Sequence, residues 1–419
     1  VNVLPTSPSR DAGNVTYLPA GTLVDIDGQP RTQGSTVDIG ATESDGVTTT
    51  FLPPVVRVSP TGNDAAAGDS WTTAKRTVQS AVDRAARTGG EVWVQAGTYD
   101  ANVQIRPFTF LYGGFNGTET NRTQRDWRSN VTVLDAGQET GAVLMTQLTL
   151  DETLDGFTIQ NGLATAGAGV FTDSSVRILH NRFASNTVVS TVPASNVRGG
   201  GAIYVAAGAP QILNNQFFRN LSASNDRNQP AEGGAIKIND GTPLIANNLF
   251  RQNVVTNAAA SGEARGAAVA TLFRGSAQVI NNTLLQNTAT VANNAAAPDQ
   301  GAVYVGNTNA PSLLGNNLVA YNSSGVFAPG RLPTLNNNLV FANIRTNYER
   351  LPDPTGTAGN LSVSPRLTGP YGDPHLQTGS PAIDAGNTNL VQAGWTDLDG
   401  RPRLQDGRVD IGADEFDGT

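Results

Sequence analysis

The chain has 419 residues, a formal net charge of −8, 38% hydrophobic residues and 15% charged residues. This acidic balance argues against a nucleic-acid-binding protein, because such proteins need a basic face. The sequence contains no cysteine, which excludes disulfides, thiolate zinc sites and cysteine nucleophiles. No apolar run is long enough to span a membrane. Val, Ile, Leu and Phe are spread throughout, so the composition indicates a folded chain rather than a disordered one.

Residues 1–43 repeat the sequence of the C-terminal tail. Ser-Pro-Ser-Arg-Asp-Ala-Gly-Asn, which starts at Ser7, matches Ser-Pro-Ala-Ile-Asp-Ala-Gly-Asn, which starts at Ser380. Val-Asp-Ile-Gly-Ala occurs at Val37 and again at Val409. The sequence in between occurs once, which indicates a recurring unit of roughly 370 residues, with this chain beginning in the tail of one unit. A single duplicated capping segment is the alternative interpretation.

An extended linker and an amphipathic helix are expected next. Residues 44–54 are rich in Thr, Pro and small residues, as an extended linker is. Residues 73–87 have helical periodicity and end at Gly89-Gly90. A helix here would cover the open end of the repeat array that follows, whose first coil otherwise exposes apolar side chains and unpaired strand edges. Its apolar face would consist of Val78, Ala81, Val82, Ala85 and Ala86.

Asparagines recur at regular intervals through the middle of the chain. Each of six lies in the same sequence frame, at spacings of 33 to 35 residues and finally 21. These six are Asn181, Asn215, Asn248, Asn282, Asn317 and Asn338, and each is followed five residues later by Asn186, Asn220, Asn253, Asn287, Asn322 or Asn343. The longer repeats contain inserts, such as residues 221–232 and 254–265, that we expect to be exposed loops.

Short β-branched runs accompany these asparagines, and together they predict a parallel β-solenoid over residues 55–370, followed by a tail region at 371–419. Because neighbouring coils lie about 4.8 Å apart, equivalent residues should stack on one another. We expect one inward column of Ile203, Ile236, Val269 and Val303. We also expect the six asparagines from Asn181 to Asn338 to form a structural ladder that hydrogen-bonds along the solenoid axis.

Two segments resemble known proteins. Val56-Arg-Val-Ser-Pro-Thr-Gly-Asn-Asp, together with Gly90-Glu-Val-Trp-Val-Gln-Ala-Gly-Thr-Tyr, is similar to the opening of right-handed parallel β-helix proteins of the pectate-lyase-like class. The tail motifs at Gly379, Asp399 and Val409 resemble the C-terminal region of choice-of-anchor Q proteins. The resemblance implies an all-β, right-handed β-helix in a secreted bacterial surface protein. It implies no activity, because this fold supports lyases, hydrolases and proteins without activity.

Lyases that resemble this class use a Lys or Arg base, with calcium, to remove a proton next to a uronate carboxylate. On that interpretation Lys237 or Arg265 is the base, and Glu232 is a metal ligand or a substrate contact. The favoured alternative is a ladder of alternating charges on a solvated face. A carboxylate pair for glycoside hydrolysis is a further candidate, drawn from Asp135, Asp151, Glu152 and Asp155. His180 and His375 are expected to be packing and turn residues.

The tail has its own candidate metal site. Asp397, Asp399 and Asp410 offer hard oxygen ligands suited to Ca²⁺, with Asp414 and Glu415 nearby in the sequence. The alternative interpretation is a set of Asx-turns in which an arginine of the tail pairs with a carboxylate. No cofactor is otherwise expected.

The sequence favours a structural protein outside the cell or at its surface. We expect a rod-like unit of a tandem array or of a self-assembling fibre, joined through the matching terminal segments, with copies of itself as partners. The first alternative is a secreted polysaccharide lyase or other carbohydrate-active enzyme, and the second is a glycan-binding adhesin. In these alternatives the partner is a cell-surface or extracellular polysaccharide.

Overall fold

In the computed structural model the chain divides into two units, Val1–Pro53 and Pro54–Thr419. The structure describes residues 9, 11–18, 24–25, 30–32, 36–40, 54–149, 151–189, 198–259, 261–292, 301–306, 308–369 and 373–418. The predicted linker lies outside these ranges except for Pro54. No helix among the described residues is both long enough and apolar enough to cross a membrane.

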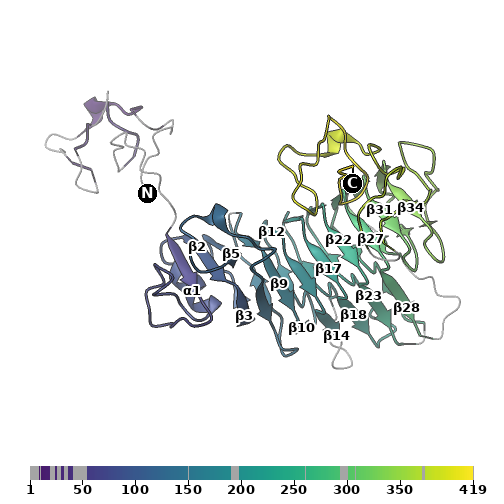
Figure 1. Ribbon diagram of the computed structural model, residues 1–419, viewed down its shortest axis with the longest axis horizontal. Helices are drawn as coiled ribbons and strands as arrows, with labels where there is room; N and C mark the ends of the chain where they lie inside the picture. The colour runs from purple at the N-terminus through teal and green to yellow at the C-terminus, as the bar shows by residue number, and fades with distance from the viewer. Residues whose placement is uncertain are drawn as a thin grey trace. The chain divides into compact units, whose positions relative to one another are not determined.

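The second unit is a right-handed parallel β-helix, as predicted, and its strands pair in parallel from coil to coil (Figure 1). The first face contains β1 (Val55–Val58), β2 (Gly90–Gln95), β5 (Thr109–Phe115), β8 (Thr153–Asp155), β12 (Arg177–Leu179), β16 (Gln211–Leu213), β21 (Leu244–Ala246), β26 (Gln278–Ile280), β30 (Leu313–Gly315) and β33 (Thr334–Asn336). The second contains β3 (Gly97–Asp100), β6 (Thr132–Asp135), β9 (Phe157–Gln160), β13 (Arg182–Ala184), β17 (Gln216–Phe218), β22 (Leu249–Arg251), β27 (Thr283–Leu285), β31 (Leu318–Ala320) and β34 (Leu339–Phe341). The third contains β4 (Val103–Gln104), β7 (Val143–Met145), β11 (Val170–Thr172), β15 (Ile203–Val205), β20 (Ile236–Ile238), β25 (Val269–Thr271), β29 (Val303–Val305), β32 (Val326–Phe327) and β35 (Tyr348–Glu349).

The inserts were expected to be exposed loops, and this expectation is wrong for their ends. A fourth parallel sheet contains β10 (Leu163–Ala164), β14 (Thr187–Val189), β18 (Leu221–Ser224), β23 (Val254–Asn257) and β28 (Thr288–Val291). A small fifth sheet pairs β19 (Ala231–Glu232) with β24 (Ala264–Arg265). Successive inserts leave the coil at the same point, so their backbones can pair just as the coils do.

Like side chains stack inside the coil. Ile203, Ile236, Val269 and Val303 are in register on consecutive coils and are almost completely buried, which confirms the predicted column. On the second face, Phe183, Phe217 and Phe250 stack with ring centroids 5.0 and 4.6 Å apart. Columns of similar apolar residues therefore fill the core from coil to coil, and burial of this apolar area provides the main stabilisation.

The predicted asparagine ladder is present and continues through Asn360. Asn248 shows the pattern, which the other members share: its Oδ1 accepts from the Asn215 backbone N–H at 2.8 Å, and its Nδ2 donates to the Ile212 carbonyl at 2.8 Å. Nδ2 also donates to Asn282 Oδ1 at 3.0 Å, which links one coil to the next. The asparagines five residues further on form a second ladder with the same geometry. Each ladder satisfies backbone groups that are buried at the corners of the coil.

Helix α1 (Val78–Ala85) covers the N-terminal end of the β-helix (Figure 1). It is shorter than predicted because Lys75 pairs with Val58 in an isolated bridge, so the helix begins only after Thr77. Asp64 accepts from the backbone N–H groups of Arg76 and Thr77, both at 2.9 Å, and this fixes the start of the helix. Val78, Ala81, Val82 and Ala85 are buried as predicted.

The C-terminal tail packs along the outside of the β-helix (Figure 1). Its contacts are directional hydrogen bonds between tail backbone and solenoid asparagines. Asn316 Oδ1 accepts from the Asn387 N–H at 2.7 Å, and Asn281 Nδ2 donates to the Asp410 carbonyl at 3.1 Å. Ile411 is fully buried in an apolar cluster that includes Leu318 of β31.

The first unit shares several local contacts with the tail. The Asp11 N–H donates to Asp38 Oδ1 at 2.7 Å, and the Asp384 N–H donates to Asp410 Oδ1 at the same distance. The Gly13 N–H donates to the Val37 carbonyl, as its counterpart Gly386 donates to Val409. Each copy also has a 3₁₀ helix that an asparagine caps: η1 (Val15–Tyr17) and η3 (Thr388–Leu390). The sequence repeat is therefore also a structural repeat.

Candidate functional site

A column of left-handed residues lies beside the first asparagine ladder. Each ladder asparagine follows a residue with positive φ, for example Asn214 at 57°, Asn281 at 53° and Asn316 at 54°. Asparagine tolerates this conformation better than most residues, which explains the recurring Asn-Asn pairs. The second asparagine of each pair faces inward to the ladder, and several of the first ones hold the tail. His180, with φ of 51°, occupies the same left-handed position one coil before Asn214.

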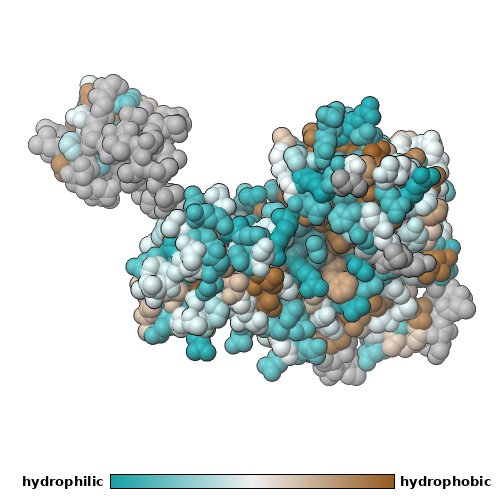
Figure 2. Space-filling model, viewed as in Figure 1, coloured by the Kyte–Doolittle hydropathy of each residue, from teal (hydrophilic) through white to brown (hydrophobic). Residues whose placement is uncertain are grey.

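A cavity of about 330 Å³ lies between the early coils and the tail. This volume is at the lower end of the roughly 300–1,000 Å³ that small-molecule pockets have. The coils supply most of its wall, and the tail closes it with Leu398 and Asp399. The solenoid side contains an aromatic ring, a histidine and two arginines: Trp127, His180, Arg128 and Arg182. The face seen in Figure 2 is mainly hydrophilic, and its apolar patches are small and separate.

His180 is held by a buried carboxylate. Its Nδ1 lies 3.0 Å from Asp155 Oδ1, and Asp155 Oδ2 accepts from Arg125 at 2.6 Å. Burial alone would raise the pKa of Asp155, but the hydrogen bond from His180 and the charge of Arg125 together hold this pKa below its usual value. An ionised carboxylate only accepts hydrogen bonds, so Nδ1 carries the proton and Nε2 is the acceptor nitrogen of neutral His180.

Trp127 gives the cavity an aromatic wall. Its ring stacks on His180, with centroids 5.1 Å apart and planes at 30°. The Arg128 guanidinium lies 4.2 Å from the Trp127 ring centroid and donates to the Leu398 carbonyl at 3.1 Å. Arg128 thus connects the early coils to the tail. The cavity offers an aromatic face for stacking, cationic groups for an anion, and a histidine that a carboxylate orients.

The candidate catalytic residues Lys237, Glu232 and Arg265 do meet, but they do so beneath the inserts. Glu232 and Lys237 are 5% and 4% exposed, so the expected solvated ladder is wrong here. Glu232 Oε2 lies 2.5 Å from Lys237 Nζ, and Glu232 Oε1 lies 2.8 Å from Arg265. Glu232 and Arg265 are paired residues of β19 and β24. A polysaccharide would not reach Lys237, and the network fits a structural ion cluster.

The four carboxylates considered for glycoside hydrolysis serve separate purposes. Asp135 accepts hydrogen bonds from Gln160 at 2.7 Å and from the Gly137 N–H at 2.9 Å. Glu152 is fully buried and accepts from the Phe108 N–H, whereas Asp151 is exposed. Asp155 belongs to the His180 pair. Only Asp155 is therefore associated with the cavity, and its partner is a histidine rather than a second carboxylate.

Two of the three predicted calcium ligands bind backbone groups instead. Asp397 Oδ1 accepts from the N–H groups of Asp399 and Arg401, at 2.9 and 2.8 Å. The two oxygens of Asp410 accept from the Asp384 and Phe416 N–H groups, both at 2.7 Å. These carboxylates thus form the turns of the tail, as the alternative interpretation predicted.

The buried ion pair expected in the tail is also present. Arg403 is fully buried and lies 3.0 Å from Glu415 Oε1. Burial raises the pKa of Glu415 to about 8, although the charge of Arg403 opposes this shift. Arg403 also donates to the carbonyls of Asp410 and Gly412 at 3.0 and 2.9 Å. Arg31, its counterpart in the first unit, donates to the Gly40 carbonyl in the same way.

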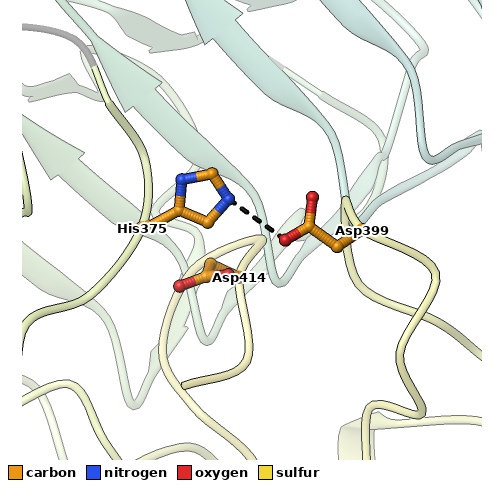
Figure 3. Close-up of side chains that lie close together, drawn as sticks. All are labelled: His375, Asp399 and Asp414. Carbon is orange, nitrogen blue, oxygen red and sulfur yellow. Dashed lines mark hydrogen bonds and ion pairs between the residues drawn. The ribbon is translucent and has the colours of Figure 1, made fainter. Parts of the chain in front are cut away.

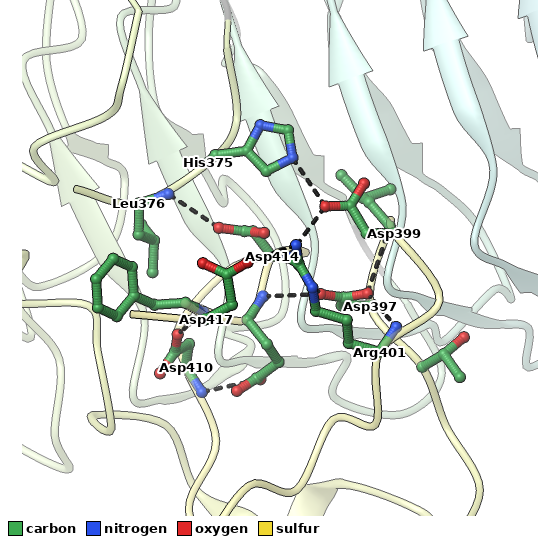
Figure 4. A network of polar contacts seen from close by, with 12 residues as sticks. His375, Leu376, Asp397, Asp399, Arg401, Asp410, Asp414 and Asp417 are labelled. Carbon is green, nitrogen blue, oxygen red and sulfur yellow. Dashed lines mark hydrogen bonds and ion pairs between the residues drawn. The ribbon is translucent and has the colours of Figure 1, made fainter. Parts of the chain in front are cut away.

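Asp399, the third predicted ligand, belongs to a different cluster. A ring nitrogen of His375 and one carboxylate oxygen from each of Asp399 and Asp414 lie within 4.8 Å of one another (Figure 3). His375 Nε2 is 3.2 Å from Asp399 Oδ2. Figure 4 shows that this cluster forms one edge of the polar network of the tail.

The chain matches no known protein-family model, and it matches none of the curated proteins with which it was compared. The sequence alone did not identify His180, Trp127 and His375 as site residues, whereas Asp414 was already among the candidate oxygen ligands of the tail. His180 does interrupt the Asn-Asn pattern as Leu-His-Asn, and this exception was the one available signal.

Proposed function

We propose that the chain is an extracellular structural protein, a rod-like unit that joins neighbouring units through its terminal segments. The observation that carries this proposal concerns two equivalent isoleucines. Ile411 of the tail is fully buried against the solenoid, whereas Ile39 of the first unit is 60% exposed. The described part of the first unit thus shares local hydrogen bonds with a docking segment, and Ile39 is exposed where its counterpart in the tail is covered.

The tail shows what such a segment binds. It docks on the outer face of a β-helix through left-handed asparagines and a cluster of leucines. Tyr17, which is 84% exposed, corresponds to Leu390, and Leu390 packs against the solenoid cluster of Leu179, Leu213, Ala246 and Ile280. The partner that fits the first unit is therefore the β-helix face of a neighbouring unit. This reading agrees with the resemblance to secreted bacterial surface proteins of the pectate-lyase-like and choice-of-anchor Q kinds.

Sedimentation velocity over a concentration series, with negative-stain microscopy, tests this proposal. The expected result is concentration-dependent association into particles joined end to end, which Ile39→Asp weakens at least tenfold. Ile344→Asp is the matched control, because Ile344 is 85% exposed but lies outside the repeated motif. Monomers at every concentration, or association that Ile39→Asp leaves unchanged, would count against the joining role.

A second candidate function is the binding of an acidic glycan in the cavity. The specific observation is the stacked Trp127–His180 pair beside Arg128 and Arg182, since aromatic rings stack on sugars and arginines pair with carboxylates. Titration calorimetry with oligouronates and with neutral oligosaccharides of equal length tests it. Trp127→Ala should abolish uronate binding, whereas Phe273→Ala, at an exposed position elsewhere, should not. Following absorbance from unsaturated products in the same samples would show whether the glycan is also cleaved.

A further inference from the structure

We propose that His375, Asp399 and Asp414 form a binding site for one divalent transition-metal ion, with zinc as the best fit. The three side chains converge from separate segments of the tail, and their ligand atoms lie within 4.8 Å of one another (Figure 3). Asp399 also lines the cavity described above, and the side chains of His375 and Asp399 are 39% and 40% exposed. An ion therefore has a route into the site from solvent.

The environment of the Asp414 carboxylate is an independent indication that a cation binds here. Its side chain is 3% exposed, and Oδ2 accepts from the Leu376 N–H at 2.9 Å. Oδ1 is buried and has no hydrogen-bond partner. Figure 4 shows the oxygen that is not bonded to Leu376 turned toward the side where His375 and Asp399 lie. A buried carboxylate oxygen without a partner is costly, and a cation at this point would satisfy it.

The histidine is oriented as metal-binding histidines are. Asp373 contacts His375 Nδ1, so this nitrogen carries the proton and Nε2 is the one that faces Asp399. A carboxylate behind the histidine is the usual outer shell of a zinc site. In a tetrahedral site with bonds of about 2.0–2.1 Å, ligand atoms lie about 3.3 Å apart. The 3.2 Å separation of His375 Nε2 and Asp399 Oδ2 fits that geometry.

Local charge also favours a cation. Asp373, Asp399 and Asp414 surround the site, and Arg401, 3.1 Å from Asp399 Oδ2, neutralises only one of these charges. A nitrogen ligand in the set selects against calcium, which takes oxygen ligands. Three protein ligands and a water would complete a tetrahedral zinc site. The ion thus differs from the Ca²⁺ that the aspartates alone suggested.

The first unit shows that the tail motif does not need these side chains in order to fold. By sequence, Asn2 and Thr42 stand where the tail has His375 and Asp414, although the aspartates that form the turns are present in both copies. Several described hydrogen bonds of the two copies nevertheless agree. His375 and Asp414 are therefore additions to the shared motif, and we expect one ion per chain rather than two.

Calorimetric titration of the metal-stripped full chain with ZnCl₂, together with thermal melting, tests the proposal. The expected result is binding of one Zn²⁺ per chain and a rise in the melting temperature of about 4 °C at a hundredfold excess over Kd. Asp414→Asn and His375→Ala should each abolish both effects. Asp414→Asn keeps an oxygen for the Leu376 N–H, so this variant is expected to fold. Asp406→Asn, an exposed substitution in the tail, should leave binding unchanged.

Two results would overturn the site. One is the absence of zinc binding in the unsubstituted chain, and the other is binding that persists in both Asp414→Asn and His375→Ala. CaCl₂ serves as the second probe. A rise in melting temperature with Ca²⁺ equal to that with Zn²⁺ would contradict the role of the histidine nitrogen. Circular dichroism of each variant in the absence of metal confirms that a lost signal does not reflect unfolding.

Discussion

His180 and Asp155 form a hydrogen-bonded pair across two neighbouring coils, with 3.0 Å between Nδ1 and Oδ1. Arg125 holds the other oxygen of Asp155, so one buried carboxylate connects three segments of the chain. The pair orients His180 toward the cavity and contributes to the stability of the early coils. The stability of the early coils and the orientation of His180 in the candidate site therefore both depend on the Asp155 side chain.

Stability should therefore fall in acid through Asp155. Its pKa is lower in the folded chain than in the unfolded chain, where it is about 3.9. Such a carboxylate stabilises the fold at pH values above the unfolded pKa, and this contribution disappears as the pH falls through the folded pKa. Urea unfolding at pH 7 and at pH 3 should show a smaller loss between these values for Asp155→Asn than for the unsubstituted chain.

At pH 7, Asp155→Asn should itself lower the free energy of unfolding by about 3–5 kcal/mol, because it leaves the Arg125 charge buried without its partner. Asp353→Asn, at an exposed position, is the matched control. Equal pH dependence in the Asp155→Asn variant and the unsubstituted chain would show that other carboxylates cause the acid sensitivity.

The ladder predicts a large effect from a small substitution. Asn248→Ala leaves the buried Asn215 N–H without its acceptor and removes the bond to the Ile212 carbonyl, which still lies in the parallel ladder with β21. An unsatisfied buried group costs about 1–3 kcal/mol and a lost hydrogen bond about 0.5–1.5 kcal/mol, so the free energy of unfolding should fall by about 1.5–4.5 kcal/mol. Chemical denaturation measures this change, and Asn309→Ala, at an exposed position, should change stability by less than about 0.5 kcal/mol. A small change in the free energy of unfolding for Asn248→Ala would mean that water replaces the hydrogen bonds of the asparagine side chain.

The buried ion cluster predicts an asymmetry between its members. Glu232→Ala leaves the buried Lys237 without its carboxylate, although Arg265 keeps Glu263, and should cost about 3–5 kcal/mol. Lys237→Met removes one cation, keeps the Glu232–Arg265 pair and fills the same space, so it should cost about 1 kcal/mol or less. Thermal melting of the two variants tests this order. The reverse order would indicate that Lys237 has a role beyond the ion pair.

Docking of the tail should depend on Asn316. Its side chain accepts from the Asn387 N–H and donates to the Asn387 carbonyl, at 2.7 and 3.1 Å. Asn316→Ala removes both bonds, and hydrogen exchange of the tail amides should accelerate about tenfold or more. Asn389→Ala, at an exposed position on η3, should leave exchange unchanged. Unaltered exchange in Asn316→Ala would show that the remaining contacts, such as the Asn281–Asp410 hydrogen bond and the leucine cluster, are enough to hold the tail.

The solenoid could be predicted from the sequence because the same pattern of asparagines and short apolar runs recurs in coil after coil. Asn215, Asn248 and Asn282 each occupy one frame, and a fold that stacks coils satisfies all of them together. The ends of the inserts were mispredicted because pairing between successive inserts stabilises them, and short polar segments do not show this pattern. Burial of Lys237 depends on those inserts, so it could not be read from its strand alone.

The sites were harder to predict because their residues come from distant parts of the chain. Seven strands, β6 to β12, lie between Trp127 and His180 in the sequence, and Asp399 reaches the same cavity from the tail. The turn-forming role of Asp397 could be anticipated because its partners are local. The partners of Asp414 are set by how the tail folds back, and the spacing of acidic residues does not encode this.

The left-handed corner positions have a consequence for how such a molecule can change. At each corner the inward-facing ladder asparagine makes the hydrogen bonds that fix the backbone. The side chain of the residue before it faces outward and is not needed for those bonds. At Asn316 it holds the tail, and at His180 it faces the cavity. A single substitution at one of these corner positions can thus introduce a new chemical group on the surface while the asparagine ladder stays intact. The surface can therefore change one coil at a time.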